Sequence, residues 1–222
     1  MNTQASAPAD TLSLPTGGGA LKGIGETFSP DLHTGTGNFT LPFALPPGRN
    51  GFQPKLDLAY STGAGNGPFG LGWSLGVPAI ARRTARGIPR YRDAEGDGAP
   101  DTFVLGGDEL VRVDDGSEPA VRRYRPRTEG LFARIEHHVD RDSWVVESRD
   151  GLVSRYGASV GGGARAVVAD PDTPGRTFSW HLSETVDPFG SRIVYEYRLD
   201  AGGEAPGRWC QLYLHAVRWI DF

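Results

Sequence analysis

The residues best spaced to bind a metal ion lie in one acidic loop. Four carboxylates of RDAEGDGAPD occupy ligand positions one, three, five and nine of a calcium loop: Asp93, Glu95, Asp97 and Asp101. Position twelve, where such a loop carries a bidentate glutamate, is Val104, and no helical pattern flanks the segment. An acidic turn between strands is the alternative, because Asp bonds readily to the following backbone. We therefore expect no resident metal ion and keep these carboxylates only as a calcium candidate.

A glycine cluster near the start of the chain has the composition of a phosphate-binding loop. It contributes five glycines within GGGALKGIGE: Gly17, Gly18, Gly19, Gly23 and Gly25. A phosphate loop would close with Gly-Lys-Ser/Thr, and a dinucleotide fingerprint would need a strand before it and a helix after it. The sequence shows none of these. We expect these glycines to have a structural role in close backbone packing and to hold no cofactor.

Nucleophiles and bases are present but do not form an activated pair in the sequence. Ser179 and His181 are two residues apart, so they share a strand face, but no G-x-S-x-G motif surrounds Ser179. The single cysteine, Cys210, is five residues from His215, a spacing that places the two on opposite faces of a strand. We expect a buried, inert thiol and no catalytic residue.

The elements that would position any such group are organised around Ser61–Gly76, STGAGNGPFGLGWSLG. Four large apolar residues alternate there and are expected to share one buried strand face: Phe69, Leu71, Trp73 and Leu75. The intervening Gly70 and Gly72 leave the other face bare, which would let another backbone approach closely. We assign these six residues a structural role.

The composition predicts an all-β chain with many short antiparallel strands and little or no helix. Of 222 residues 38% are hydrophobic, and 32 Gly and 17 Pro supply frequent turns. Apolar alternation at the spacing of all-β folds predicts six strands after residue 100, near 102–105, 109–113, 120–125, 131–136, 143–148 and 152–156. We expect these strands to form part of a curved sheet or shell.

Two hairpins are predicted with their turns. Gly37–Leu45 and Phe52–Tyr60 flank a turn containing Asn50-Gly51, a pair that favours a primed hairpin type. Phe178–Val186 and Ser191–Arg198 flank DPFG, in which Asp and Gly are suited to a tight turn. Each pair of segments should be antiparallel.

The charge pattern gives no reason to expect a nucleic-acid partner or a membrane span. The net charge is −4, and each cluster of arginines is followed by acids, which indicates a solvated strand face or an ion-pair network. No segment approaches the roughly 18–20 apolar residues of a membrane helix. The first residues show no ordinary secretory signal, so we expect any export to use a non-classical route from the cytoplasm.

Several segments resemble the SpvB-type amino-terminal domain, shared by a plasmid virulence protein and the B components of insecticidal toxin complexes. Besides STGAGNGPFGLGWSLG, the matching pieces are SLPTGGGALKGIGETFSP (13–30), TGTGNFTLPFALPPGRNGFQPKLDLAYSTGAG (34–65), RGIPRY (86–91) and FSWHLSETVDPFGSRIVYEYR (178–198). The last piece also resembles a loose tyrosine-aspartate (YD) repeat of Rhs-type proteins. The polar composition of residues 1–11 predicts a disordered lead-in, followed by one β domain over 12–222. Because the sequence ends on an apolar strand-like run, we expect this domain to be truncated at its C-terminal end.

The resemblance implies a non-enzymatic module in the β-rich shell of a secreted toxin. In the insecticidal complexes such a shell encloses a toxic C-terminal polypeptide, the C-type cargo, and docks on a pore-forming A component. One alternative is the secretion or delivery domain of an ADP-ribosylating virulence factor, whose transferase motifs this chain lacks. A second alternative is a cell-surface module that binds carbohydrate or protein through exposed aromatic side chains.

Overall fold

A computed structural model describes residues 27–31, 35–85, 87–92, 99–113, 120–128, 130 and 132–219. The expected lead-in, all five glycines of the GGGALKGIGE cluster, and Asp93, Glu95 and Asp97 lie outside this part of the chain. The described residues form seventeen strands and one short 3-10 turn, η1 (Arg49–Gly51), which confirms the all-β prediction. None of them forms a helix with the length and hydropathy needed to cross a bilayer.

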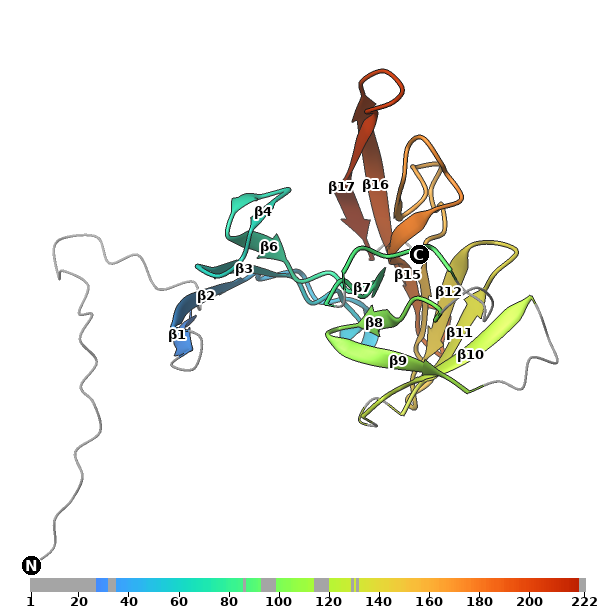
Figure 1. Ribbon diagram of the computed structural model, residues 1–222. Helices are drawn as coiled ribbons and strands as arrows, with labels where there is room; N and C mark the ends of the chain where they lie inside the picture. The colour runs from blue at the N-terminus through green and yellow to red at the C-terminus, as the bar shows by residue number, and fades with distance from the viewer. Residues whose placement is uncertain are drawn as a thin grey trace, which may run out of the picture.

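Eight strands form a closed antiparallel ring (Figure 1). In order around the ring they are β7 (Ala79–Arg82), β8 (Phe103–Leu105), β9 (Asp108–Arg112), β10 (Val121–Pro126), β11 (Arg134–His138), β12 (Ser143–Glu147), β13 (Val153–Tyr156) and β15 (Thr177–Val186). The six strands predicted after residue 100 correspond to β8–β13. Each of these six strands pairs with the next one along the chain, so their order in space follows their order in sequence.

Strand β15 closes the ring because it is long enough to pair with four partners. Its first half pairs with β7 and with β14 (Val167–Ala169), and its second half pairs with β13 and with β16 (Arg192–Gly202). Strand β16 then pairs along its length with β17 (Trp209–Arg218). The resulting hairpin extends away from the ring (Figure 1). Strand β15 therefore belongs to the closed ring and also pairs with the first strand of the open hairpin.

The inside of the ring is filled by aromatic side chains. Trp144 and Trp180 are fully buried, and Phe103 lies between them with ring centroids 5.0 and 5.7 Å away. His137 stacks on Trp144 at 4.3 Å and 11°. Because these residues come from β8, β11, β12 and β15, the aromatic contacts join opposite walls of the ring and leave it packed rather than hollow.

A second, smaller sheet precedes the ring. It has the order β1 (Thr27–Asp31), β2 (Thr36–Pro42), β3 (Asp57–Ser61) and β6 (Trp73–Leu75), all antiparallel. The pairing of β2 with β3 confirms that the two segments of the first predicted hairpin are antiparallel, but their connection is longer than expected, because the strands end at Pro42 and resume at Asp57. Asn50 and Gly51 in its connection both have positive φ, 53° and 75°, as a primed turn requires. Trp219 Nε1 donates a hydrogen bond to the Pro46 carbonyl at 3.2 Å, which ties this connection to the end of β17.

The expectation that Phe69, Leu71, Trp73 and Leu75 share a buried strand face is wrong. The segment divides at Gly72 into β6 and a small hairpin of β4 (Asn66–Gly67) and β5 (Gly70–Leu71). Phe69 is 47% exposed and Leu71 is 71% exposed, whereas Trp73 and Leu75 are half-buried. Trp73 contacts Tyr60 and Phe39 at ring centroid distances of 5.1 and 6.5 Å. The alternation predicts one strand, but the positive φ of Gly72 turns the chain in its middle.

Candidate assembly surface

The turn between β11 and β12 joins two walls of the ring through Asp142. Trp180 Nε1 donates to the Asp142 Oδ1 at 2.9 Å and to its carbonyl at 3.1 Å. Thr177 Oγ1 donates to Oδ2 at 2.7 Å, and Arg165 forms an ion pair with the same carboxylate at 3.2 Å. Asp142 has a φ of 48°, a left-handed conformation that Asp tolerates better than most residues. This turn therefore fixes the indole of the largest core residue on β15.

A buried arginine occupies another position in the same core. Arg82 lies over the rings of Phe103 and Trp180, 5.1 and 5.6 Å from their centroids. Its Nε donates to the Thr177 carbonyl at 2.8 Å, and Nη1 forms an ion pair with Asp101 at 3.0 Å. Burial of this charge is compensated by the carboxylate and by cation–π contacts.

Asp101 is the only one of the four calcium candidates in the described part of the chain, and it has structural partners there. Besides Arg82, it accepts hydrogen bonds from the backbone N–H groups of Arg90 and Tyr91 at 3.0 and 2.6 Å. Among the described residues, no three His, Cys, Asp or Glu side chains lie close enough together to hold a metal ion. The described geometry of Asp101 is that of an acid that anchors a loop to β7.

Glu184 connects the ring to the extended hairpin. Its side chain is buried, and its carboxylate accepts from Arg155 on β13 at 2.6 Å and from Arg192 Nε on β16 at 2.6 Å. Breaking such a buried pair leaves an uncompensated charge, so the three strands are coupled at this point. The sequence pattern did not single out Glu184 as a site residue. A signal was available, because a lone carboxylate within the strand TFSWHLSETV has to find a cationic partner if that strand is buried.

The β15–β16 turn has the hydrogen bonding expected of its Asp and Gly. Asp187 Oδ1 accepts from the backbone N–H groups of Phe189 and Ser191 at 2.9 and 2.7 Å. Gly190, with a φ of 86°, donates to the Asp187 carbonyl at 3.1 Å. This confirms the second predicted hairpin.

Three tyrosines pack where the hairpin leaves the ring. Burial raises the pKa of Tyr195 to about 12, and burial together with the nearby Tyr195 raises the pKa of Tyr156 to about 12. Tyr197 has the most strongly raised pKa of the three, and burial is the largest cause. Its hydroxyl donates a hydrogen bond to the Leu182 carbonyl at 2.8 Å. All three phenols are therefore neutral near pH 7.

The nucleophile and base candidates lie in structural surroundings. Ser179 Oγ and His181 Nε2 are 3.3 Å apart within β15, on the same face as their spacing predicts. Burial lowers the pKa of His181, which packs against the ring of Tyr197. Cys210 is half-buried rather than buried as expected, because it lies on the extended hairpin, where its Sγ is 3.2 Å from the Ala169 carbonyl.

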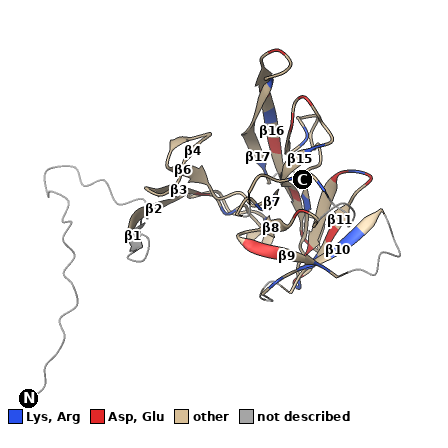
Figure 2. Ribbon diagram, viewed as in Figure 1, with Lys and Arg blue, Asp and Glu red and all other residues tan. Residues whose placement is uncertain are grey.

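Acidic and basic residues lie on the neighbouring strands β9, β10 and β11 (Figure 2). Glu136 pairs with Arg123 at 3.3 Å and with Arg134 at 2.7 Å, and Glu109 pairs with Arg83 and Arg127. These contacts confirm the predicted ion-pair network.

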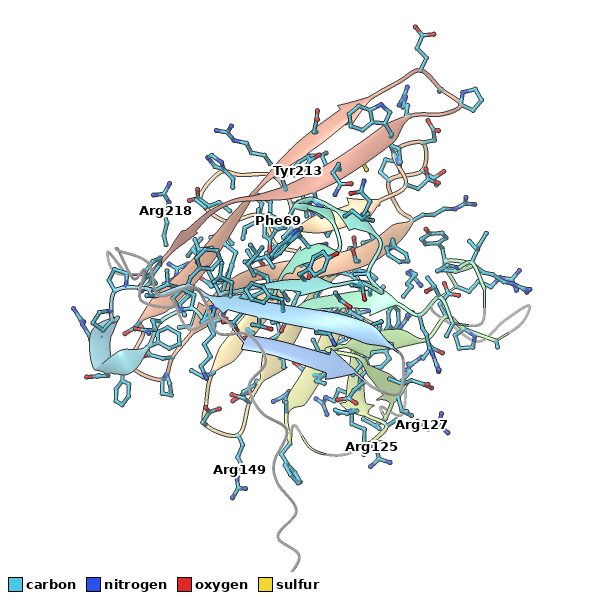
Figure 3. The ribbon with its side chains drawn as sticks, turned by 90° about the vertical axis from the view of Figure 1, so that its left-hand side faces the viewer. Phe69, Arg125, Arg127, Arg149, Tyr213 and Arg218 are labelled. Carbon is cyan, nitrogen blue, oxygen red and sulfur yellow. The ribbon has the colours of Figure 1, made fainter. Side chains whose placement is uncertain are left out.

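The open elements of the fold are sheet edges and exposed apolar side chains. In the described part of the chain β17 ends the larger sheet, and β1 and β6 end the smaller one. The β16–β17 hairpin exposes half or more of Leu199 and Trp209 and 39% of Tyr213. Figure 3 shows Tyr213 on the side of the molecule from which Phe69 also projects. Exposed edges and apolar patches of this kind mark surfaces for pairing with further chain.

A filled ring, an extended hairpin and open strand edges define a structural all-β module. A model of the family described as SpvB, Salmonella virulence plasmid 65kDa B protein, matches residues 31–208. The chain belongs to this family. The Mono(ADP-ribosyl)transferase SpvB of Salmonella typhimurium is 36% identical over 220 residues, and that of Salmonella dublin is equally similar. Each match covers 88% of this chain but 35% of the relative, so the chain spans about a third of the relatives' length.

Solved structures of toxins share the fold. TcdB2-TccC3 is 35% identical, with a TM-score of 0.74, over 94% of this chain and 11% of that chain. The Tc holotoxin pore of Photorhabdus luminescens is 35% identical, with a TM-score of 0.71, over 93% of this chain and 10% of that chain. The N-terminal domain of the effector SpvB from Salmonella typhimurium is 33% identical, with a TM-score of 0.64, over 81% of this chain and 63% of that chain.

Proposed function

We propose that this chain is a non-enzymatic wall segment of a secreted toxin, part of a β-rich shell that encloses a toxic C-terminal polypeptide and helps to deliver it. The observation that carries the proposal is the double role of β15, which closes the ring and also begins an open sheet ending at β17. A filled ring is a rigid anchor, and an open edge can receive the next strand of a continuous wall. Such a wall satisfies its backbone hydrogen bonds internally and leaves few edges exposed.

The similarity to TcdB2-TccC3 supports this role and suggests the partners. A match of 94% of this chain to 11% of that chain is what one wall segment of a large assembly would give. On this proposal the partners are a C-type cargo component inside the shell and an A-type pore component outside it. The domain would then extend over residues 12–222.

The relatives named Mono(ADP-ribosyl)transferase support a second candidate function. Because this chain spans about a third of them, and also matches the N-terminal domain of the effector SpvB, it would be the secretion or delivery domain of such a protein. In both candidates the described β module carries no chemistry.

A segment exchange tests the shell proposal. The matched segment of TcdB2-TccC3 is replaced by this chain, and protection of the C-terminal polypeptide from an added protease is measured. We expect the chimera to protect that polypeptide as the parent does. A chimera that folds but leaves the polypeptide open to cleavage would refute the shell role and favour the delivery domain. Transfer of ADP-ribose from NAD by the isolated chain would contradict both.

A further inference from the structure

We propose that a cavity at the rim of the ring, where β11 ends and β12 begins, binds a small organic oxyanion, a phosphate or carboxylate attached to an apolar group. The cavity has a volume of about 370 Å³. This lies within the roughly 300–1,000 Å³ typical of small-molecule sites. It lies over the ends of β11, β12 and β13 and beside the segment 157–165. The proposed shell role makes no use of it, so the two proposals stand independently.

The walls of the cavity are positively charged. Arg141, Arg155 and Arg165 line it together with His138, and no Asp or Glu is among its lining residues. The acids that pair with these arginines are not among the residues that line the cavity. Arg155 donates to the buried Glu184, and Arg165 pairs with Asp142. A ligand in the cavity would therefore meet the guanidinium groups before the carboxylates.

These arginines retain hydrogen-bonding capacity. Each guanidinium carries five N–H donors in a planar fork that matches phosphate and carboxylate oxygens. Arg165 uses Nη2 for its bonds to Asp142 and to the Arg141 carbonyl, and Arg155 uses Nη1 for Glu184. The ion pair of Arg141 with Asp140 runs from Nε at 3.6 Å, between two exposed side chains. Donors on all three side chains are left for an oxyanion.

The floor of the cavity is apolar. Val145 and Ala158 are half-buried and contribute apolar surface to it, whereas Trp144 and Tyr156 border the cavity but expose only 0% and 5% of their surface. The raised pKa of Tyr156, about 12, keeps its phenol neutral, so the floor adds no negative charge. An inorganic ion would leave this surface uncovered, whereas a ligand with a ring or short carbon chain would bury it.

The segment beside the cavity is held in place at two points. Gly157 has a φ of +81°, and a Cβ there would lie 2.6 Å from Trp180 Cδ1, so only glycine fits without a shift of the core. Farther along, Arg165 Nη2 donates to the carbonyls of Arg141 and Asp142 at 3.2 and 2.8 Å. A preformed site of this kind loses little entropy when it binds a ligand.

Titration of the full 222-residue chain tests the proposal. Phenyl phosphate, inorganic phosphate and phenol are added separately, and binding is followed by calorimetry and by amide NMR shifts near Gly157. We expect phenyl phosphate to bind more tightly than inorganic phosphate, and phenol not to bind. Benzoate tests whether a carboxylate replaces the phosphate.

Matched arginine variants locate the site. Arg141 is 77% exposed, so Arg141→Gln should fold normally and weaken phenyl phosphate binding on the order of tenfold, which corresponds to one lost charge-assisted contact. Arg149→Gln is the control, since this exposed arginine points away from the molecule (Figure 3) and does not line the cavity. Its affinity should equal that of the parent chain.

Three results would overturn the proposal. The first is the absence of phenyl phosphate binding. The second is equal loss of affinity in Arg141→Gln and Arg149→Gln, which would indicate non-specific attraction. The third is equal binding of phenol or of inorganic phosphate, which would remove either the charge or the apolar group from the recognition.

Discussion

A pair of glycine substitutions separates backbone strain from steric overlap in the small hairpin. Gly70 and Gly72 both have positive φ, +99° and +80°. A Cβ at Gly70 would meet no atom within 4 Å. A Cβ at Gly72 would lie 2.5 Å from Tyr60 Cε2 and 2.9 Å from the Ser61 carbonyl oxygen. Gly70→Ala therefore tests the conformation alone, and Gly72→Ala tests the conformation together with the close approach.

The expected free energies differ because only one site is crowded. The left-handed conformation costs an L-residue roughly 1–2 kcal/mol, of which the reduced entropy of the unfolded Ala chain returns about 0.4–1. Gly70→Ala should therefore lose about 1 kcal/mol. Overpacking adds about 1–3 kcal/mol at Gly72, where the Ser61 backbone cannot move without breaking its 2.9 Å hydrogen bond to the Gly72 carbonyl. Gly72→Ala should lose about 2–4 kcal/mol.

Hydrogen exchange measures this locally, since the small sheet can open without the ring. Amide exchange is followed by mass spectrometry in peptides covering 57–75. Because each 1.4 kcal/mol is a factor of ten, Gly72→Ala should speed exchange by about 30- to 1,000-fold and Gly70→Ala by about fivefold. Peptides from β11 and β12 serve as an internal control and should not change. Equal effects of the two variants would refute the argument, because the crowding at Gly72 would then contribute nothing.

Three further predictions concern buried ionisable groups. Glu184→Gln should lower the free energy of unfolding, measured by urea denaturation, by about 3 kcal/mol, because it leaves Arg155 and Arg192 facing a neutral amide. Asp140→Asn, in an exposed pair, is the control and should change it by less than about 1 kcal/mol. Similar losses in the two variants would contradict the importance of the buried pair. The raised pKa values of Tyr156 and Tyr195 stabilise the folded chain fully below pH 10, and this contribution should be lost between about pH 10 and 12. Absorbance titration of the phenols checks this, and titration of every tyrosine near pH 10 would disprove it. The lowered pKa of His181 means that the unfolded chain takes up the proton first, so stability should fall as the pH drops below about 6.5. His181→Gln should flatten that part of the urea midpoint profile, and an unchanged profile would show that other groups cause it.

Much of the fold was predictable because its signals are local. Alternation and turn residues located β8–β13 and both predicted hairpins, including the turn at Asp187. The charge pattern on β9, β10 and β11 also indicated the ion pairs around Glu136. Alternation failed between Phe69 and Leu75, because a period of two does not show whether a glycine between apolar residues continues a strand or turns the chain.

The sequence by itself determined that this chain is all-β, where most strands lie, and which successive segments pair as hairpins. Only the tertiary structure decided that β15 meets both β7 and β13, and so closes the ring. The pairing of Trp180 with Ile80 joins residues a hundred positions apart, and no local pattern encodes which distant strand fills an open edge. The same closure brings Asp142 to Trp180 and Arg155 to Glu184. These polar contacts depend on the geometry of the ring rather than on any motif in the chain.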